Sequence, residues 1–170
     1  MRDSPILLLI ANQGVPGIMH AISPWRRGFS VEGVFELRRS NDQRALSVRQ
    51  PWAYAILHLG KDVENRPWRT HYRGRILIQA ALKIEREEAL KLKLSPGELP
   101  TGAIVGSVEI VDCVRNSKSK WAIGGQWHWI LKNPRYLAKL IPFKGALGFI
   151  RVPTRLLNGK HFHAPHKGHK

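Results

Sequence analysis

The chain has 170 residues, and its 28 lysines and arginines outnumber its 12 aspartates and glutamates, which gives a formal net charge of +16. Its content of 43% hydrophobic and 24% charged residues is typical of a globular protein. The single cysteine excludes an internal disulfide and a cysteine-based zinc site, and the longest apolar run, residues 6–11, is too short to span a membrane. We therefore expect a cytoplasmic protein with no cofactor, no metal site and no membrane partner.

The first segment, residues 1–44, keeps neither a helical nor a strand-like period, and Pro, Gly and Ser are scattered through it. We expect an irregular N-terminal arm outside the main fold. This arm is either disordered or, if translation begins at Met19, partly absent from the protein.

The middle segment, residues 45–153, contains the structural signals. Apolar and β-branched runs predict strands over residues 45–48, 75–80, 103–114, 126–131 and 144–152. Helices are expected over residues 51–60 and 84–94, with a short helical turn over 133–137. Pro51 suits the start of the first helix and Gly60 its end, while Gly106 predicts a bulge. This pattern indicates an α+β domain, a small β-barrel with two or three peripheral helices.

The last segment, residues 154–170, is basic and rich in histidine, and it has no apolar period. We expect a flexible tail. Most of the charge excess lies before it, because residues 45–153 contain 18 basic and eight acidic side chains. Such an excess favours polyanionic partners through counterion release, so RNA, a nucleotide or DNA is the expected partner class.

The most distinctive stretch joins the first helix to the segment after Gly60. Glu64 and Arg66 share a face if this segment is extended, and Lys61 is close enough to pair with Glu64. Arginine forks suit phosphate, and tryptophan offers a flat surface for stacking. The candidate nucleic-acid-binding residues are Arg49, Gln50, Lys61, Glu64, Arg66, Trp68, Arg69, Arg73 and His128.

A structural interpretation of the same residues stays open. The helix macrodipole alone favours a cation at the position of Lys61. Glu64 can serve only in an ion pair, and Trp52, on the apolar helix face, suits a core. In that case the protein acts through protein–protein contacts.

Several motifs together resemble the activating signal cointegrator homology (ASCH) domain. They are Leu46-Ser47-Val48-Arg49-Gln50-Pro51-Trp52, the block from Gly60 to Trp68, Tyr72-Arg73-Gly74, Ile76-Leu77-Ile78, residues 102–106, residues 111–114, Gln126-Trp127-His128-Trp129 and residues 145–148. The resemblance covers about residues 45–152. It implies a barrel similar to the RNA-binding PUA domains, and a cleft with the signature Gly-x-Lys-x-x-Glu-x-Arg that binds RNA or a nucleotide.

One departure affects which residues are carried over from the family. The signature has one residue between its glycine and its lysine, whereas Gly60 directly precedes Lys61 and Leu59 takes the glycine's place. Lys61, Glu64 and Arg66 keep their mutual spacing, so the resemblance assigns these three to the cleft. Gly60 is interpreted as a helix stop.

The resemblance also leaves an enzyme as the alternative, with Lys61 and Glu64 as the catalytic residues. One branch of the family hydrolyses N4-acetylcytidine with a Lys-x-x-Thr arrangement, and Glu64 stands where that threonine would be. Glu109 could then face the cleft as a second carboxylate. In a ribonuclease, His128 or Lys61 would act as the acid or base.

Two further side-chain placements are expected around the later strands. Cys113 lies among Val and Ile, which predicts an inert core residue. In Trp127-His128-Trp129 the side chains alternate, so either the tryptophans fill the core and His128 faces the cleft or solvent, or the reverse holds. We expect the first, because two exposed neighbouring tryptophans would form a large apolar patch. Trp121, in a loop, could contact a ligand.

Overall fold

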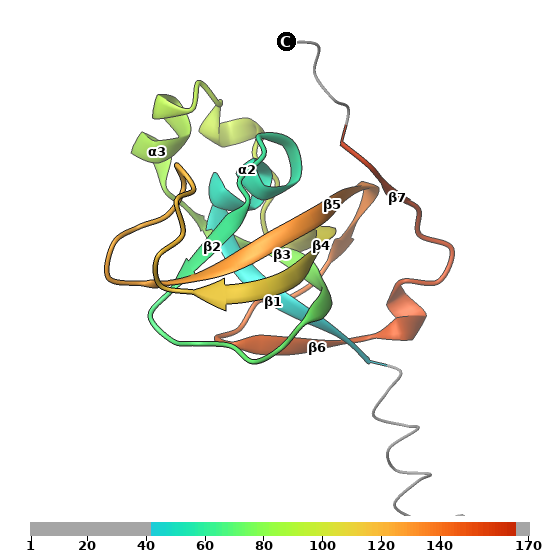
Figure 1. Cartoon of the computed structure of the whole chain (residues 1–170). Helices are drawn as coiled ribbons and strands as arrows, with labels where there is room; N and C mark the ends of the chain where they lie inside the picture. Colours follow the sequence, from blue (N-terminus) through green and yellow to red (C-terminus); the bar gives the residue numbers. More distant parts are fainter. Residues whose placement is uncertain (1–41, 166–170) are drawn as a thin grey trace, which may run out of the picture.

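The computed structural model describes residues 42–165 (Figure 1). The prediction for the arm 1–44 therefore lies almost wholly outside the described residues. Its last three residues differ from the prediction, because the first strand, β1, spans Asp42–Gln50 and includes them.

A seven-stranded, mostly antiparallel sheet forms the body of the domain. After β1 its strands are β2 Val63–Arg66, β3 Gly74–Ile84, β4 Ala103–Val114, β5 Trp127–Pro142, β6 Phe149–Pro153 and β7 Phe162–His163. The order is β2-β5-β4-β3-β1-β6, and β7 pairs with β5. Among the strands of residues 42–165, only β1 and β3 pair in parallel, and the crossover between them contains helix α2, Trp52–His58.

The expected α+β class is confirmed, whereas the expected closed barrel is not seen. Within residues 42–165 the strand order is open, because no pairing joins β2 at one end to β6 at the other. The sheet curves around α2 (Figure 1). The second helix, α3, spans Arg86–Lys91, and two 3-10 turns occupy Pro96–Glu98 and Thr154–Leu156.

Alternation along the strands divides the apolar side chains between two clusters. The larger cluster contains Leu46 and Val48 of β1, Ile56 of α2 and the fully buried Trp129. The smaller lies on the other face, with Ala45 of β1 and Leu77 of β3. Cys113 is 5% exposed, which confirms the expected core position.

The end of α2 positions the first candidate residue. Gly60 adopts a φ of +70°, a left-handed conformation that favours glycine, so its expected role as a helix stop is confirmed. The Lys61 N–H then donates to the Ala55 carbonyl at 3.0 Å. This turn sends the Lys61 side chain back into the domain.

Two predicted elements in the last third of the chain are wrong. Residues 133–137 belong to the long strand β5, because pairing with β4 overrides the local signal of Asn133-Pro134. Asn133 absorbs the local change of direction with a φ of +50°. The strand expected over 144–152 is β6, which begins at Phe149, because residues 144–148 leave the sheet and residues 144–147 line a cleft.

The segment after β6 also differs from the expected flexible tail. Thr154–Leu156 forms a 3-10 turn, and β7 pairs with β5. Leu156, Leu157 and Phe162 pack against the smaller core cluster, which explains the order of this segment. His166 and His169 lie outside the described residues. In the described part of the chain, no helix is long and apolar enough to cross a membrane.

We expect Gly106→Ala to destabilise the domain by about 1–3 kcal/mol, the usual cost of overpacking. A Cβ at this position would lie 2.7 Å from a Leu57 methyl group and closer still to the Arg135 carbonyl oxygen. Gly97→Ala is the control, because a Cβ there meets nothing within 4 Å. Urea unfolding of both variants measures the difference; equal midpoints would contradict this packing of β4 between α2 and β5.

Candidate functional site

A cleft of about 1550 Å³ opens between α2, the segment 61–66, the loop 115–126 and the loop 142–148. Its floor carries polar residues from β1 and β2, and its sides carry apolar and cationic residues. The principal lining residues are Ser47, Arg49, Trp52, Lys61, Glu64, Asn65, Arg66, Leu82, Glu85, Lys91, Lys120, Trp121, Ile123, Gln126, Phe143, Lys144, Gly145 and Leu147.

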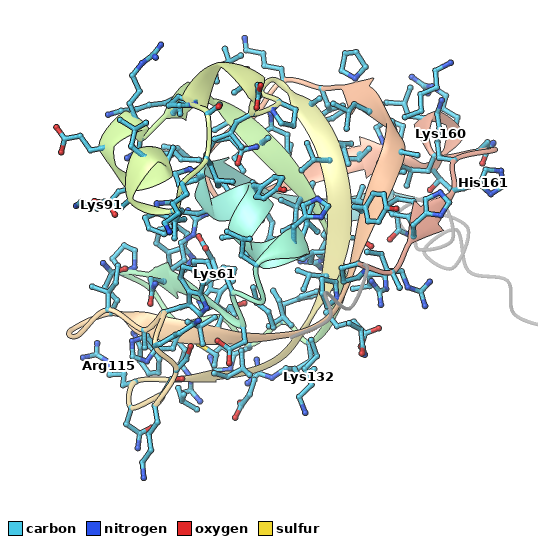
Figure 2. The ribbon with its side chains drawn as sticks, turned by 90° about the horizontal axis from the view of Figure 1, so that it is seen from above. Lys61, Lys91, Arg115, Lys132, Lys160 and His161 are labelled. Carbon is cyan, nitrogen blue, oxygen red and sulfur yellow. The ribbon has the colours of Figure 1, made fainter. Side chains whose placement is uncertain are left out.

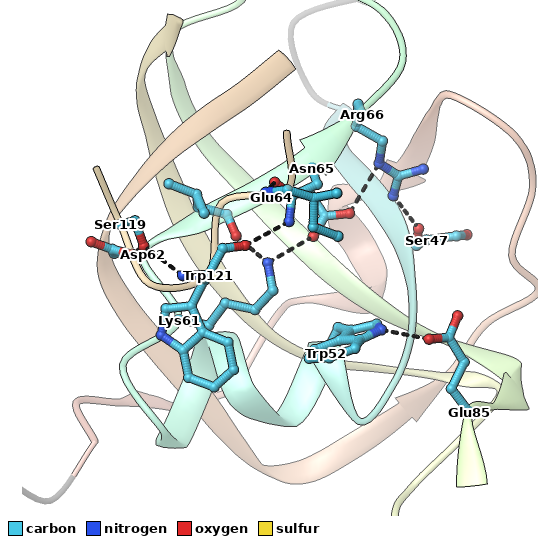
Figure 3. A network of polar contacts seen from close by, with 12 residues as sticks. Ser47, Trp52, Lys61, Asp62, Glu64, Asn65, Arg66, Glu85, Ser119 and Trp121 are labelled. Carbon is cyan, nitrogen blue, oxygen red and sulfur yellow. Dashed lines mark hydrogen bonds and ion pairs between the residues drawn. The ribbon is translucent and has the colours of Figure 1, made fainter. Parts of the chain in front are cut away.

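Three charged side chains form the floor (Figure 3). The Glu64 carboxylate lies between two cations: its Oε2 is 3.6 Å from Lys61 Nζ and its Oε1 is 3.0 Å from Arg66 Nε. Lys61 Nζ also donates to the Val63 carbonyl, and Arg66 donates to the Ser47 carbonyl at 2.7 Å. We call Lys61, Glu64 and Arg66 the charged floor, which carries a net charge of +1 when all three are ionised.

The charged floor is largely removed from water. Lys61 is 4% exposed and Glu64 is 7% exposed. Burial lowers the pKa of the Lys61 ammonium from its ordinary 10.5, and the neighbouring Glu64 carboxylate opposes part of that effect. Charges held in such surroundings act more strongly on a ligand than the same charges on an open surface.

Two tryptophans stand above the charged floor. Trp52 and Trp121 meet edge to face, with ring centroids 6.4 Å apart, and Lys61 Nζ lies 6.0 Å from the Trp52 ring. Trp52 Nε1 donates to Glu85 at 2.8 Å, which fixes the orientation of its indole. The expectation that Trp52 belongs to the core is met only in part, because one side of the ring packs on the core and the residue also lines the cleft.

Side chains from β2 and β5 hold the loop that carries Trp121 in place. Asn65 donates to the Trp121 carbonyl at 2.8 Å and accepts the Ile123 N–H at 3.0 Å. Asp62 accepts a hydrogen bond from Ser119 (Figure 3). Residues 62 and 65 thus fix the cleft wall, while their neighbours in sequence form its floor.

His128 supports the same loop from β5. Its Nδ1 accepts the Ser117 N–H at 3.2 Å, and its Nε2 lies 2.9 Å from the Ile123 carbonyl. Because a backbone N–H points at Nδ1, Nε2 carries the proton and donates to that carbonyl. The expectation that His128 faces the cleft or solvent is wrong: it is 3% exposed beneath the loop.

The rim of the cleft combines cations with exposed apolar side chains. Arg49, Lys91, Lys120 and Lys144 lie among its lining residues, and Lys120 Nζ lies 5.3 Å from the Trp121 ring. Leu82 is 80% exposed and Leu147 is 99% exposed. In Figure 2, Lys61 points inward, whereas Lys91 and Arg115 lie at the periphery on one side of the molecule and Lys160 on the opposite side.

The structure gathers four of the nine candidate residues in the cleft: Arg49, Lys61, Glu64 and Arg66. The other five do not line it. Gln50 is buried, donating to the Pro100 carbonyl and accepting from the Tyr54 N–H. Arg73 pairs with Asp112 at 2.8 Å. Trp68 and Arg69 lie on an exposed surface beyond Arg66, and His128 lies beneath the loop.

Sequence reasoning did not identify Asn65, Ser47 or Gly145 as parts of the site. Gly145 allows a close approach of the backbone to β1 and β3, because a Cβ there would lie 2.7 Å from Ser47 Oγ and 2.5 Å from Gln79 Oε1. Asn65 stands between Glu64 and Arg66, so its position in the signature was the available signal. No signal in the sequence indicated that Asn65 contacts a loop more than 50 residues further along the chain.

Glu109 does not face the cleft as the enzyme alternative allowed. It pairs with Arg75 at 2.5 Å and accepts from Asn133 at 2.8 Å. Hydrogen bonds from Asn133 and then Arg75 lower the pKa of its carboxyl. Within residues 42–165, no group of three His, Cys, Asp or Glu side chains is placed to hold a metal ion.

The fold and the cleft together define an α+β domain whose charged floor lies at the junction of its first helix and its second strand. The ASCH domain model matches residues 46–141, which is more than half of the chain. This chain therefore belongs to the ASCH domain family, and the resemblance noted in the sequence is confirmed.

Two curated relatives match this chain over about two thirds of its length. Activating signal cointegrator 1 of Homo sapiens is 31% identical over 133 residues, and its counterpart of Mus musculus is 29% identical over 133 residues. Each alignment covers 67% of this chain and 23% of the relative. The similarity thus spans about a quarter of the length of these relatives.

We expect Asn65→Ala to loosen the loop 115–126 without unfolding the sheet. The change removes two hydrogen bonds between β2 and the loop, each worth about 0.5–1.5 kcal/mol. Hydrogen exchange followed by mass spectrometry should show faster exchange in peptides covering 117–126 and little change in β3 and β4. Asn116→Ala, at an exposed position, is the control. Unchanged hydrogen exchange of the loop in Asn65→Ala would show that Asn65 does not hold it in place.

The lowered pKa of Lys61 predicts a specific dependence of stability on pH. Between that pKa and 10.5, the Lys61 side chain binds more protons in the unfolded chain than in the folded chain. Its contribution to the free energy of unfolding therefore increases as the pH rises. Lys61→Met lacks this gain. The stability of the natural chain relative to the variant should therefore rise as the pH increases through the alkaline range towards 10.5.

Urea unfolding at a series of pH values from 7 to 10 measures this difference. Lys139→Met replaces an exposed lysine, and the stability of the natural chain relative to this control should stay constant. If the stability of the natural chain rose with pH by the same amount relative to both variants, the burial of Lys61 would not be the cause of the rise.

Proposed function

We propose that this domain binds RNA or a nucleotide in the cleft above the charged floor. The observation that carries the proposal is the combination in one cleft of the buried, ion-paired Lys61 and Glu64 and the half-buried Arg66 with the indoles of Trp52 and Trp121. Nucleic acids present phosphate, hydrogen-bonding base edges and flat rings, and this cleft supplies a complement to each.

Each part of the cleft has a separate role in this proposal. The two indoles are nearly perpendicular, so one of them stacks its free face against a base, an interaction worth about 1–3 kcal/mol per base. Arg66 and Lys61 attract phosphate, and the Glu64 carboxylate accepts a hydrogen bond from a base or sugar. Lysines 91, 120 and 144 add a diffuse positive field at the rim.

Membership of the family supports the same proposal. The resemblance implies a relation to the PUA RNA-binding domains, which we retain although the sheet of this chain is open. The high net charge of +16 also favours a polyanion. Charge alone does not distinguish RNA from DNA, so DNA is one arm of the test. We retain a cytoplasmic setting as the expectation from the single cysteine.

A hydrolase acting on a modified nucleoside is the second candidate, and the lowered pKa of Lys61 favours it. Because its pKa is lowered, a larger fraction of this amine is neutral at a given pH than of an ordinary lysine, and only the neutral amine can accept a proton. With N4-acetylcytidine, water would add to the acetyl carbonyl and the C–N bond would break, giving acetate and cytidine. Lys61 and Glu64 are the groups of this chain that would hold and deprotonate that water.

One assay on the full chain separates these functions. The natural chain and Lys61→Met are incubated with single-stranded RNA, with DNA of the same sequence and with N4-acetylcytidine. We expect RNA binding that weakens at least about tenfold in Lys61→Met, because the variant removes a buried charge at the floor. Fluorescence anisotropy measures binding, and chromatography measures products.

Lys160→Gln is the matched control, since it removes one cation on the far side of the molecule (Figure 2). Equal RNA binding by the natural chain and both variants would mean that binding depends only on the overall positive charge. That result would contradict the proposed cleft. Cytidine formed by the natural chain and not by Lys61→Met would replace the binding function with the hydrolase.

A further inference from the structure

We propose that a bound single strand of RNA leaves the cleft past Arg66 and continues over a second basic surface. This surface consists of Trp68, Arg69, Arg115 and Trp127, and we call it the arginine shelf. The inference rests on the proposed function, because it extends the same ligand from the cleft to a second set of contacts. It explains the two candidate residues, Trp68 and Arg69, that are exposed outside the cleft.

The arginine shelf adjoins the cleft at two points. Arg66 lines the cleft and pairs with Trp127 across the β2–β5 ladder, so their side chains lie side by side on one face of the sheet. Gln126 lines the cleft and immediately precedes Trp127. In addition, the Arg66 guanidinium lies 5.4 Å from the centre of the Trp68 ring. A strand passing Arg66 therefore reaches the shelf without crossing an intervening element.

Trp127 orients the two arginines of the shelf. The guanidinium of Arg115 lies 4.7 Å from the centre of its ring, and that of Arg69 lies 5.5 Å from it. A guanidinium held against an aromatic ring keeps its N–H groups available for a phosphate. Trp127 itself packs against the core, so it provides a fixed base for both cations.

The charges of the shelf are available to a ligand. Within residues 42–165, neither Arg69 nor Arg115 forms an ion pair with a carboxylate, whereas the neighbouring Arg73 pairs with Asp112. Both arginines are exposed, and Arg115 lies at the periphery in Figure 2. Both guanidinium groups lie within 5.5 Å of the centre of the same ring, so a strand that passes Trp127 places its phosphates against both.

Trp68 gives the shelf a stacking surface. It is 41% exposed, although its backbone is anchored where the Trp129 indole N–H donates to the Trp68 carbonyl at 3.2 Å. Its ring also meets the buried Trp129 edge to face at 6.1 Å. An exposed aromatic ring fixed in this way is suited to a base of the strand, while Arg69 and Arg115 contact its phosphates.

The test compares RNA oligonucleotides of different length on the full chain. Single-stranded RNAs of 3, 6, 9 and 12 nucleotides are titrated against the natural chain, the double variant Arg69→Gln with Arg115→Gln, and Lys61→Met. The matched control is Arg155→Gln, an exposed arginine on the 3-10 turn Thr154–Leu156. Thermal unfolding verifies that the variants are folded.

We expect the double variant to bind the 12-nucleotide RNA about tenfold more weakly, while its affinity for the trimer is unchanged. The slope of log K against log salt for the long RNA should fall by about 1.4, since each lost phosphate contact on a single strand accounts for about 0.7. Lys61→Met should weaken binding at every length, and Arg155→Gln at none.

The outcomes separate this inference from the proposed function. If Lys61→Met weakens binding but the double variant keeps the natural salt slope, the cleft binds RNA and the arginine shelf is overturned. If the double variant loses the same factor for the trimer and the 12-nucleotide RNA, the shelf as an extension of the cleft is also overturned. If Lys61→Met binds normally while the double variant is weak with long RNA only, the arginine shelf binds RNA without the cleft, and both the cleft assignment and the shelf as its extension are overturned.

Discussion

The buried ammonium of Lys61 is the constraint on which the site depends. An isolated charge in this position would cost several kcal/mol in lost hydration, so the chain must surround it with acceptors. The Val63 carbonyl and the Glu64 carboxylate meet that demand, and Arg66 completes the arrangement by bridging Glu64 to the Ser47 carbonyl. β2, which pairs with β5, thus carries both partners that surround the buried amine.

The same constraint links the floor of the cleft to its wall. Once Glu64 and Arg66 are turned toward Lys61, the residue between them is left to contact the loop 115–126, and Asn65 does so through the backbone of Trp121 and Ile123. His128 supports this loop from the neighbouring strand. Some polar residues around the cleft therefore face the space where a ligand would bind, and others hold the loop 115–126 in place.

Much of the fold could be predicted from local sequence. The apolar runs located β1, β3 and β4 and Gly60 marked the end of α2, because each signal is short-range and agrees with the packing. The helical turn expected at 133–137 failed because pairing of β5 with β4 outweighs a local Asn-Pro signal. The open end of the sheet could not be foreseen, since closure depends on strand pairings between residues far apart in sequence.

The candidate site was predictable where its residues are close in sequence. The spacing of Lys61, Glu64 and Arg66 indicated a common face, and the structure brings them together. The buried position of His128 was not predictable, because its partners belong to a loop without regular structure. The separation of Trp68 and Arg69 from the cleft was equally hidden, since the turn after Arg66 carries them onto a different surface.

The four-residue length of β2 has an evolutionary consequence. Within Val63–Arg66, successive side chains serve the floor and the loop in turn, so inserting or deleting one residue would exchange the two sets at once. A single substitution alters one contact, whereas an insertion or deletion of one residue turns the side chains beyond it to the opposite face of the strand. In descendants of this chain, the segment from Lys61 to Arg66 should therefore keep its length, because an insertion or deletion disturbs the floor and the loop contacts together.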